Sequence, residues 1–167
     1  MFRLDGKPAL VTGASGGIGA AIARALHAQG AIVVLSGTRK DALEALAGEL
    51  GERAYVAPAD LRDKAAPDKL VAAAEKAAGP LHILVNNAGL TRDMLALRMK
   101  DEDWLGVLDV DLTAPFRLAR ACLRGMLRRR AGRIIGIASI VAVTGNPGQS
   151  NYAAAKAGLI GMSKALA

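Results

Sequence analysis

The stretch PALVTGASGGIGAAIARALHAQG, residues 8–30, decides the fold of this chain. Its first five residues form the apolar run of a buried strand, and its second half has helical spacing and ends in a glycine, a common helix cap. Between them, Gly13, Gly17 and Gly19 allow a tight turn and a close approach of the backbone to a bound group. The N-terminus of the helix supplies free N–H groups and a partial positive charge. This strand–turn–helix unit predicts a site for nucleotide phosphates.

Short β-branched runs and helical stretches alternate along the rest of the chain. Apolar strands separated by helices are typical of a parallel sheet covered on both faces. We therefore predict one α/β domain over residues 1–167, a doubly wound, Rossmann-like parallel sheet. Strands are expected at 8–12, 31–36, 53–57, 81–86 and 133–139, and helices at 17–30, 40–50, 64–78, 101–130 and from about Ser150.

The composition excludes several classes of protein. Hydrophobic residues make up 52% and charged residues 22%, which is typical of a folded domain rather than a disordered chain. No apolar run approaches the ~20 residues of a membrane-spanning helix, and the N-terminus lacks an apolar signal segment. Cys122 is the only cysteine, so no internal disulfide is possible. We expect a cytoplasmic protein without a membrane partner, and His27 and His82, two isolated histidines, do not indicate a metal site.

Positive charge gathers in the last third of the chain. Residues 112–167 carry nine basic and no acidic side chains, and seven of the nine are arginines between Arg117 and Arg133. Two interpretations are open: a solvated helix face, or a docking surface for an acidic partner. Nucleic acid is not the expected partner, because only 3% of the residues are aromatic and base stacking needs such rings.

The segment LSGTRKD, residues 35–41, bears on the choice of dinucleotide. A carboxylate at the end of the second strand binds the ribose 2′-hydroxyl of NAD, whereas an arginine accommodates the 2′-phosphate of NADP. Here Arg39 and Lys40 follow the strand without a preceding carboxylate, which favours NADP(H); the alternative is that both are ordinary surface charges. Asp60, at the expected end of the third strand, either binds the adenine amino group or caps a turn.

Near the end of the chain, Tyr152 and Lys156 lie four residues apart in NYAAAKAG and share one helix face. A free tyrosine phenol, with a pKa of about 10, is a weak acid at neutral pH, and a neighbouring cation makes a phenol more acidic. The Ser139 hydroxyl can donate a hydrogen bond to the oxygen that the phenol would protonate. The three residues suit a carbonyl that accepts a hydride and then a proton, although such a Tyr–Lys pair also arises by chance.

Together, TGASGGIG (12–19), NNAG (86–89), Ser139 and the Tyr152–Lys156 pair resemble the short-chain dehydrogenase/reductase family. Within the family, the chain looks most like bacterial 3-oxoacyl-[acyl-carrier-protein] reductases. The resemblance implies an NADP-dependent oxidoreductase that reduces a 3-oxoacyl thioester, carried by the acidic acyl carrier protein, to the 3-hydroxyacyl thioester in fatty acid synthesis. The alternatives are an acetoacetyl-CoA or other small-ketone or alcohol oxidoreductase of the same family, and an inactive nucleotide-binding fragment. Relatives are usually tetramers.

The same resemblance implies roles for single residues. Tyr152 would be the general acid, Lys156 would assist it and bind the nicotinamide ribose, and Ser139 would orient the carbonyl. Arg128, Arg129 and Arg130 would form the surface that meets the carrier protein, and Asn86 would brace the sheet. The expected cofactor-binding residues are Gly13, Ser15, Gly17, Ile18, Gly19, Arg39, Asp60, Leu61, Asn87, Ala88, Gly89, Tyr152 and Lys156.

Two departures from the family pattern stand out. Asp111 occupies the position of a catalytic asparagine in the family. Pro115, four residues on, has no N–H to bond the carbonyl of residue 111, so we expect Asp111 to keep a catalytic role by holding a water through its main chain. The chain also ends at Ala167, inside the helix that carries Lys156, whereas the family continues with two more strands. We expect a C-terminally truncated fragment that is inactive or poorly folded by itself.

Overall fold

The structure is a computed structural model that describes residues 3–167. Its centre is a five-stranded sheet in the order β3-β2-β1-β4-β5, and every neighbouring pair is parallel. Leu10 in the central strand pairs with Val34 on one side and Leu84 on the other. The α/β class and the five strands are confirmed. The strands are β1 Pro8–Val11, β2 Ile32–Leu35, β3 Ala54–Val56, β4 Ile83–Asn86 and β5 Arg133–Gly136.

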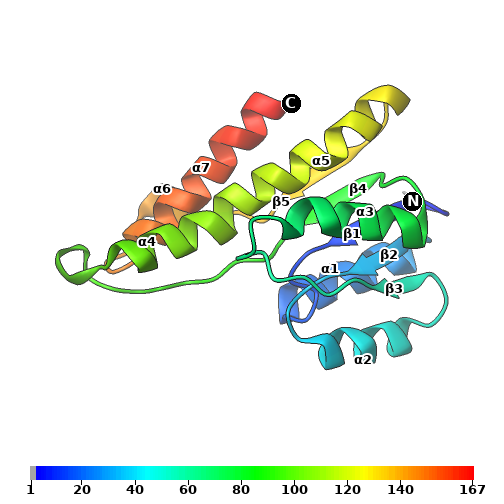
Figure 1. Cartoon of the computed structure of the whole chain (residues 1–167), viewed down its shortest axis with the longest axis horizontal. Coiled ribbons are helices and arrows are strands. Elements are labelled where there is room, and N and C mark those ends of the chain that lie inside the picture. The colour runs from blue at the N-terminus through cyan, green and yellow to red at the C-terminus, as the bar shows by residue number, and fades with distance from the viewer. Residues whose placement is uncertain (1–2) are drawn as a thin grey trace.

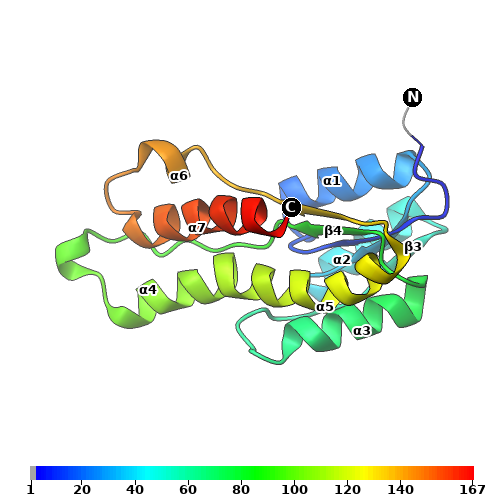
Figure 2. The ribbon, with the colours of Figure 1, turned by 90° about the horizontal axis from the view of Figure 1, so that it is seen from above.

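Helices cover both faces of the sheet (Figure 2). In β1, Leu10 packs into a core with the helices α3 and α5, while Ala9 and Val11 pack into a second core with α1 and α2. Both sets of side chains are fully buried, which explains why this strand is apolar without alternation. The helices are α1 Gly17–Ala28, α2 Lys40–Leu50, α3 Ala66–Ala78, α4 Asp101–Leu108, α5 Ala114–Arg129, α6 Val141–Thr144 and α7 Ser150–Leu166, with a short 3₁₀ turn, η1, at Ala96–Arg98.

The first helix ends as its sequence predicts. Gly30 has a φ of +94°, its N–H donates to the His27 carbonyl at 2.9 Å, and the Ala31 N–H donates to the Leu26 carbonyl at 3.2 Å. This pair of bonds is a Schellman cap, for which glycine is favoured. Helix α5 ends in the same left-handed conformation without a glycine, at Arg130, whose φ is +52°.

The continuous helix expected at 101–130 is interrupted. Between α4 and α5 lies η2, a π-helical turn at Asp109–Thr113, although the two helices form one rod in Figure 1. Pro115 gives the physical reason, because its nitrogen cannot donate to the carbonyl of Asp111 and the regular bonding pattern fails there. Such wide turns occur often at functional sites.

The last strand is shorter than the expected 133–139. Its pairing with β4 ends where the Ile137 N–H donates to the Asn86 carbonyl at 2.9 Å, after which the chain leaves the sheet and forms α6, which the sequence did not predict. Helix α7 begins at Ser150 as expected and packs against α4 and η2 (Figure 1). Within residues 3–167, no helix combines the length and the apolar character needed to cross a membrane.

Candidate functional site

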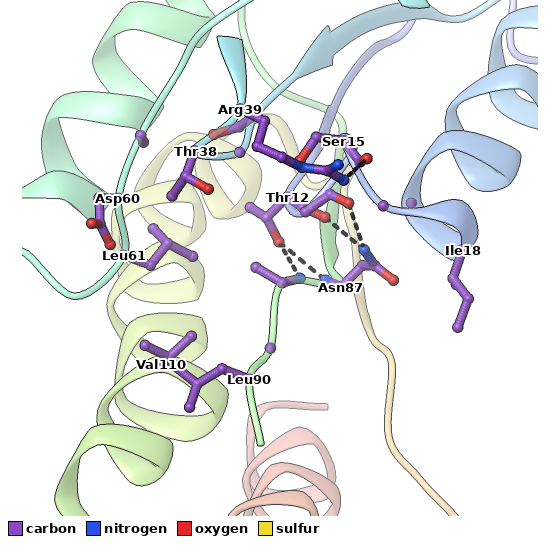
Figure 3. A pocket seen from close by; sticks show the side chains of 18 of the residues that line it. Thr12, Ser15, Ile18, Thr38, Arg39, Asp60, Leu61, Asn87, Leu90 and Val110 are labelled. Atoms are coloured by element: carbon purple, nitrogen blue, oxygen red, sulfur yellow. Dashed lines mark hydrogen bonds between the residues drawn. The ribbon is translucent and has the colours of Figure 1, made fainter. Parts of the chain in front are cut away.

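A cavity of about 610 Å³ opens at the carboxyl ends of β1, β2 and β4 (Figure 3). The chain runs from β1 to β2 on one side, whereas β4 lies on the other side of β1. Open α/β sheets bind ligands at this kind of topological switch point. The glycine turn, the residues after β2 and the loop after β4 line the cavity, so most of the predicted cofactor residues lie together here.

The structure explains why three positions of the first turn are glycines. Gly13 has a φ of +64°, and a Cβ on Gly19 would lie only 2.3 Å from the Gly13 carbonyl oxygen. Those two positions therefore serve the packing of the turn. A Cβ on Gly17, by contrast, would meet nothing within 4 Å, and no side chain caps the N-terminus of α1. The backbone at Gly17 is thus open to the cavity, and the turn fits the phosphates of a dinucleotide.

Thr12 holds the turn against the loop after β4, a role that the sequence analysis missed. Its buried Oγ1 accepts the N–H groups of Asn87 and Ala88, each at 3.0 Å, and donates to the Val85 carbonyl at 3.1 Å. The Asn87 amide adds a bond to the Thr12 carbonyl at 2.9 Å. Asn86 bonds within the sheet through its carbonyl, which accepts the Ile137 N–H at 2.9 Å. Its buried side-chain amide has no hydrogen-bond partner in residues 3–167.

The end of the cavity away from the loop after β4 is cationic. The Arg39 guanidinium donates to the Ser15 carbonyl, and both residues line the cavity (Figure 3). Asp60 lies in the loop after β3 rather than at the strand end, and its carboxylate accepts from the Arg62 side chain at 2.9 Å. Hydrogen bonds from Arg62 hold the pKa of Asp60 below its usual value. Ile18 lines the opposite side, with 65% of its surface exposed.

Three of the four predicted catalytic residues, Ser139, Tyr152 and Lys156, follow β5 and lie outside the lining of this cavity. Ser139 is in the loop after β5, where its Oγ accepts the Val141 N–H at 3.3 Å. Tyr152 is half-buried in the first turn of α7. One turn later, the Lys156 Nζ lies 5.5 Å from the centre of the Tyr152 ring. The structure therefore brings the ammonium beside the phenol ring, as the helical spacing predicts.

Asp111 meets Lys156 through its side chain. The carboxylate is fully buried, its Oδ2 lies 3.2 Å from the Lys156 Nζ, and its Oδ1 accepts the Leu90 N–H at 2.8 Å. Burial raises the pKa of Asp111, although the charge of Lys156 and the bond from Leu90 act against that rise. A Cβ at Gly89 would lie 2.8 Å from Oδ2. The carboxylate therefore leaves no room for a side chain at this position. The sequence analysis did not predict this ion pair.

The arginines at the end of α5 do not share one environment. Arg128 and Arg130 are exposed, whereas Arg129 is half-buried and donates to the Leu81 carbonyl at 2.6 Å. Arg129 therefore ties α5 to the segment before β4. Upstream, the Arg120 guanidinium covers the exposed Phe116 ring at 5.5 Å.

Comparisons with known proteins show the family of this chain. The model of the short chain dehydrogenase family matches residues 7–167. Nodulation protein G of Rhizobium sp. (strain N33) is 60% identical over 170 residues, which cover all of this chain and 68% of the relative. The 3-oxoacyl-[acyl-carrier-protein] reductases FabG of Rickettsia bellii and Escherichia coli are 51% and 48% identical, and each is again covered over 68% of its length. The chain thus spans about two thirds of the length of these relatives. The chain therefore belongs to the short-chain dehydrogenase family, whose members are oxidoreductases that act on CH–OH and C=O groups.

Proposed function

We propose that the protein reduces a 3-oxoacyl thioester to the 3-hydroxyacyl thioester with NADPH, as a cytoplasmic step of fatty acid synthesis. One observation carries the proposal: the buried Lys156 ammonium lies beside Tyr152, on the helix that packs against the π turn next to the nucleotide cavity. The similarity to two 3-oxoacyl-[acyl-carrier-protein] reductases supports the choice of substrate.

The cavity residues suit the cofactor. The open backbone at Gly17 and the uncapped N-terminus of α1 would hold the pyrophosphate. Arg39, next to Ser15, would meet the ribose 2′-phosphate that distinguishes NADPH from NADH. Asn87, Ala88 and Gly89 line the cavity after β4 and would flank the nicotinamide ribose.

When bound, the nicotinamide supplies the hydride for the keto carbon. The Tyr152 hydroxyl donates its proton to the carbonyl oxygen, and the Ser139 hydroxyl donates a hydrogen bond to the same oxygen. Lys156 holds its positive charge beside the phenol, where it stabilises the phenolate that remains after the transfer.

Replacement of Tyr152 tests this proposal. Tyr152→Phe removes the proton donor and keeps the ring, so we expect turnover of a 3-oxoacyl thioester to fall at least ~100-fold, with NADPH affinity unchanged. The loss of NADPH absorbance measures the turnover, and calorimetry measures the affinity. Full turnover by the variant would exclude Tyr152 as the acid. A wild-type protein, expressed from its complete reading frame, that binds NADPH without turnover would favour a nucleotide-binding module.

Exposed positive charge at the end of α5 supports a docking surface for the carrier protein. The acyl carrier protein is acidic, and Arg128 and Arg130 are open to solvent at the end of α5. Charge reversal of both should raise KM for the carrier-bound substrate more than for a small thioester, because only the carrier meets this surface. Equal changes for both substrates would remove the docking role. The homotetramer stays a prediction from the resemblance.

A second candidate is reduction of a different small ketone, such as acetoacetyl-CoA, by the same residues. The 60% identity to Nodulation protein G, a name that states no reaction, favours keeping this candidate open. A panel of keto substrates, ranked by kcat/KM, separates the two: a preference for carrier-bound substrates supports the first, and a preference for free thioesters or ketones supports the second.

A further inference from the structure

The catalytic lysine is held from two sides within the protein. The Lys156 Nζ donates to the Ile137 carbonyl, at the end of β5, at 3.1 Å and contacts the Asp111 carboxylate at 3.2 Å. Lys156 is only 4% exposed and Asp111 is fully buried, so bulk water and salt screen this pair much less than a surface pair. An ammonium has three N–H donors, and the Ile137 carbonyl accepts one of them.

The same carboxylate bonds to a residue that lines the nucleotide cavity. Its Oδ1 accepts the N–H of Leu90, and Leu90 lines the cavity together with Val110, the neighbour of Asp111 in the π turn. Asp111 thus joins the loop after β4 to the lysine on α7. The other carboxylate of this turn, Asp109, forms no hydrogen bond or ion pair with Leu90 or Lys156 and is half-exposed.

We propose that the Asp111 carboxylate is a positioning residue that anchors the Lys156 ammonium by its charge, so that the lysine is preorganised for the nicotinamide-ribose half of the dinucleotide. The inference rests on the proposed function. An amide at this position keeps the acceptor for Leu90 but turns an N–H group toward the ammonium, so the lysine loses its anchor on that side.

Two ligands separate this role from a merely structural one. NADPH reaches both halves of the site, whereas adenosine 2′,5′-bisphosphate reaches only the end near Arg39. Asp111→Asn should weaken NADPH about tenfold, within the usual range of coupling between sites, and leave the bisphosphate affinity unchanged in calorimetry. Asp109→Asn is the matched control and should change neither affinity. If Asp111→Asn lowered the affinities for both ligands equally, or lowered neither, the inference would be overturned.

A double-variant cycle tests whether Asp111 acts through the lysine. In a Lys156→Met background there is no ammonium to anchor, so adding Asp111→Asn should not change NADPH affinity further. The double variant removes both buried charges, which keeps the test open if Asp111→Asn alone does not fold. The same loss in both backgrounds would contradict the inference alone. A wild-type chain that binds neither ligand would overturn the proposed function and this inference with it.

Discussion

The two halves of the candidate site are built in different ways. The nucleotide half depends on close backbone approaches: the glycine turn, the Thr12 hydroxyl and the Asn87 amide lie within hydrogen-bond distance of one another. The lysine half depends on one buried pair of opposite charges, Asp111 and Lys156. The first half should therefore be sensitive to added volume and the second to lost charge.

The largest expected loss of unfolding free energy follows from a substitution in the lysine half of the site. Lys156→Met leaves the Asp111 carboxylate buried without its cation, and removing one partner of a buried pair costs about 3–5 kcal/mol of unfolding free energy. Urea unfolding measures the loss. Lys164→Met, at an exposed position of the same helix, is the control and should cost less than about 0.5 kcal/mol. A loss for Lys156→Met as small as that of the control would show that the pair is not a structural element.

The next largest effect on stability is expected at Gly19, and Gly17 provides the comparison. A Cβ on Gly19 would press on the Gly13 carbonyl, which is backbone and cannot swing aside, so Gly19→Ala should lose about 2–3 kcal/mol. Gly17→Ala meets open space and should keep the stability while losing NADPH affinity, because the methyl group occupies the space of the phosphates. Thermal unfolding and calorimetry measure the two quantities. Normal NADPH binding by Gly17→Ala would place the phosphates elsewhere.

The smallest effect is a dependence on pH. The pKa of Asp111 is raised above its ordinary value of 3.8 by burial, so the folded chain binds this proton more readily than the unfolded chain. The stability that the shifted pKa of Asp111 adds to the free energy of unfolding is fully present below pH 3.8. It is lost as the pH rises through the raised pKa. The unfolding free energy of Asp111→Asn minus that of the wild type should therefore increase as the pH rises from 3.8. Urea titrations at several pH values check the sign, and a flat or falling difference would contradict the raised pKa.

Much of the fold follows from local pattern. The five strands and the start of α7 were predictable because apolar runs, glycines and caps act over a few residues. The interruption at Asp109–Thr113 was not predicted, although Pro115 marked the place. The early end of β5 was also missed, because strand length depends on whether a neighbouring strand continues to pair, which no local pattern records.

The sequence alone determined the sheet class, the nucleotide turn and the Tyr152–Lys156 spacing, since each is a consequence of residues close together along the chain. Only the tertiary structure decided that Asp111 pairs with Lys156, that the Thr12 hydroxyl bonds to the loop after β4 and that Arg129 donates to the Leu81 carbonyl. These contacts join residues far apart along the chain, and packing of helices on the sheet sets their distances. The strength of a charge pair or a buried hydrogen bond depends on that distance and on the exclusion of water.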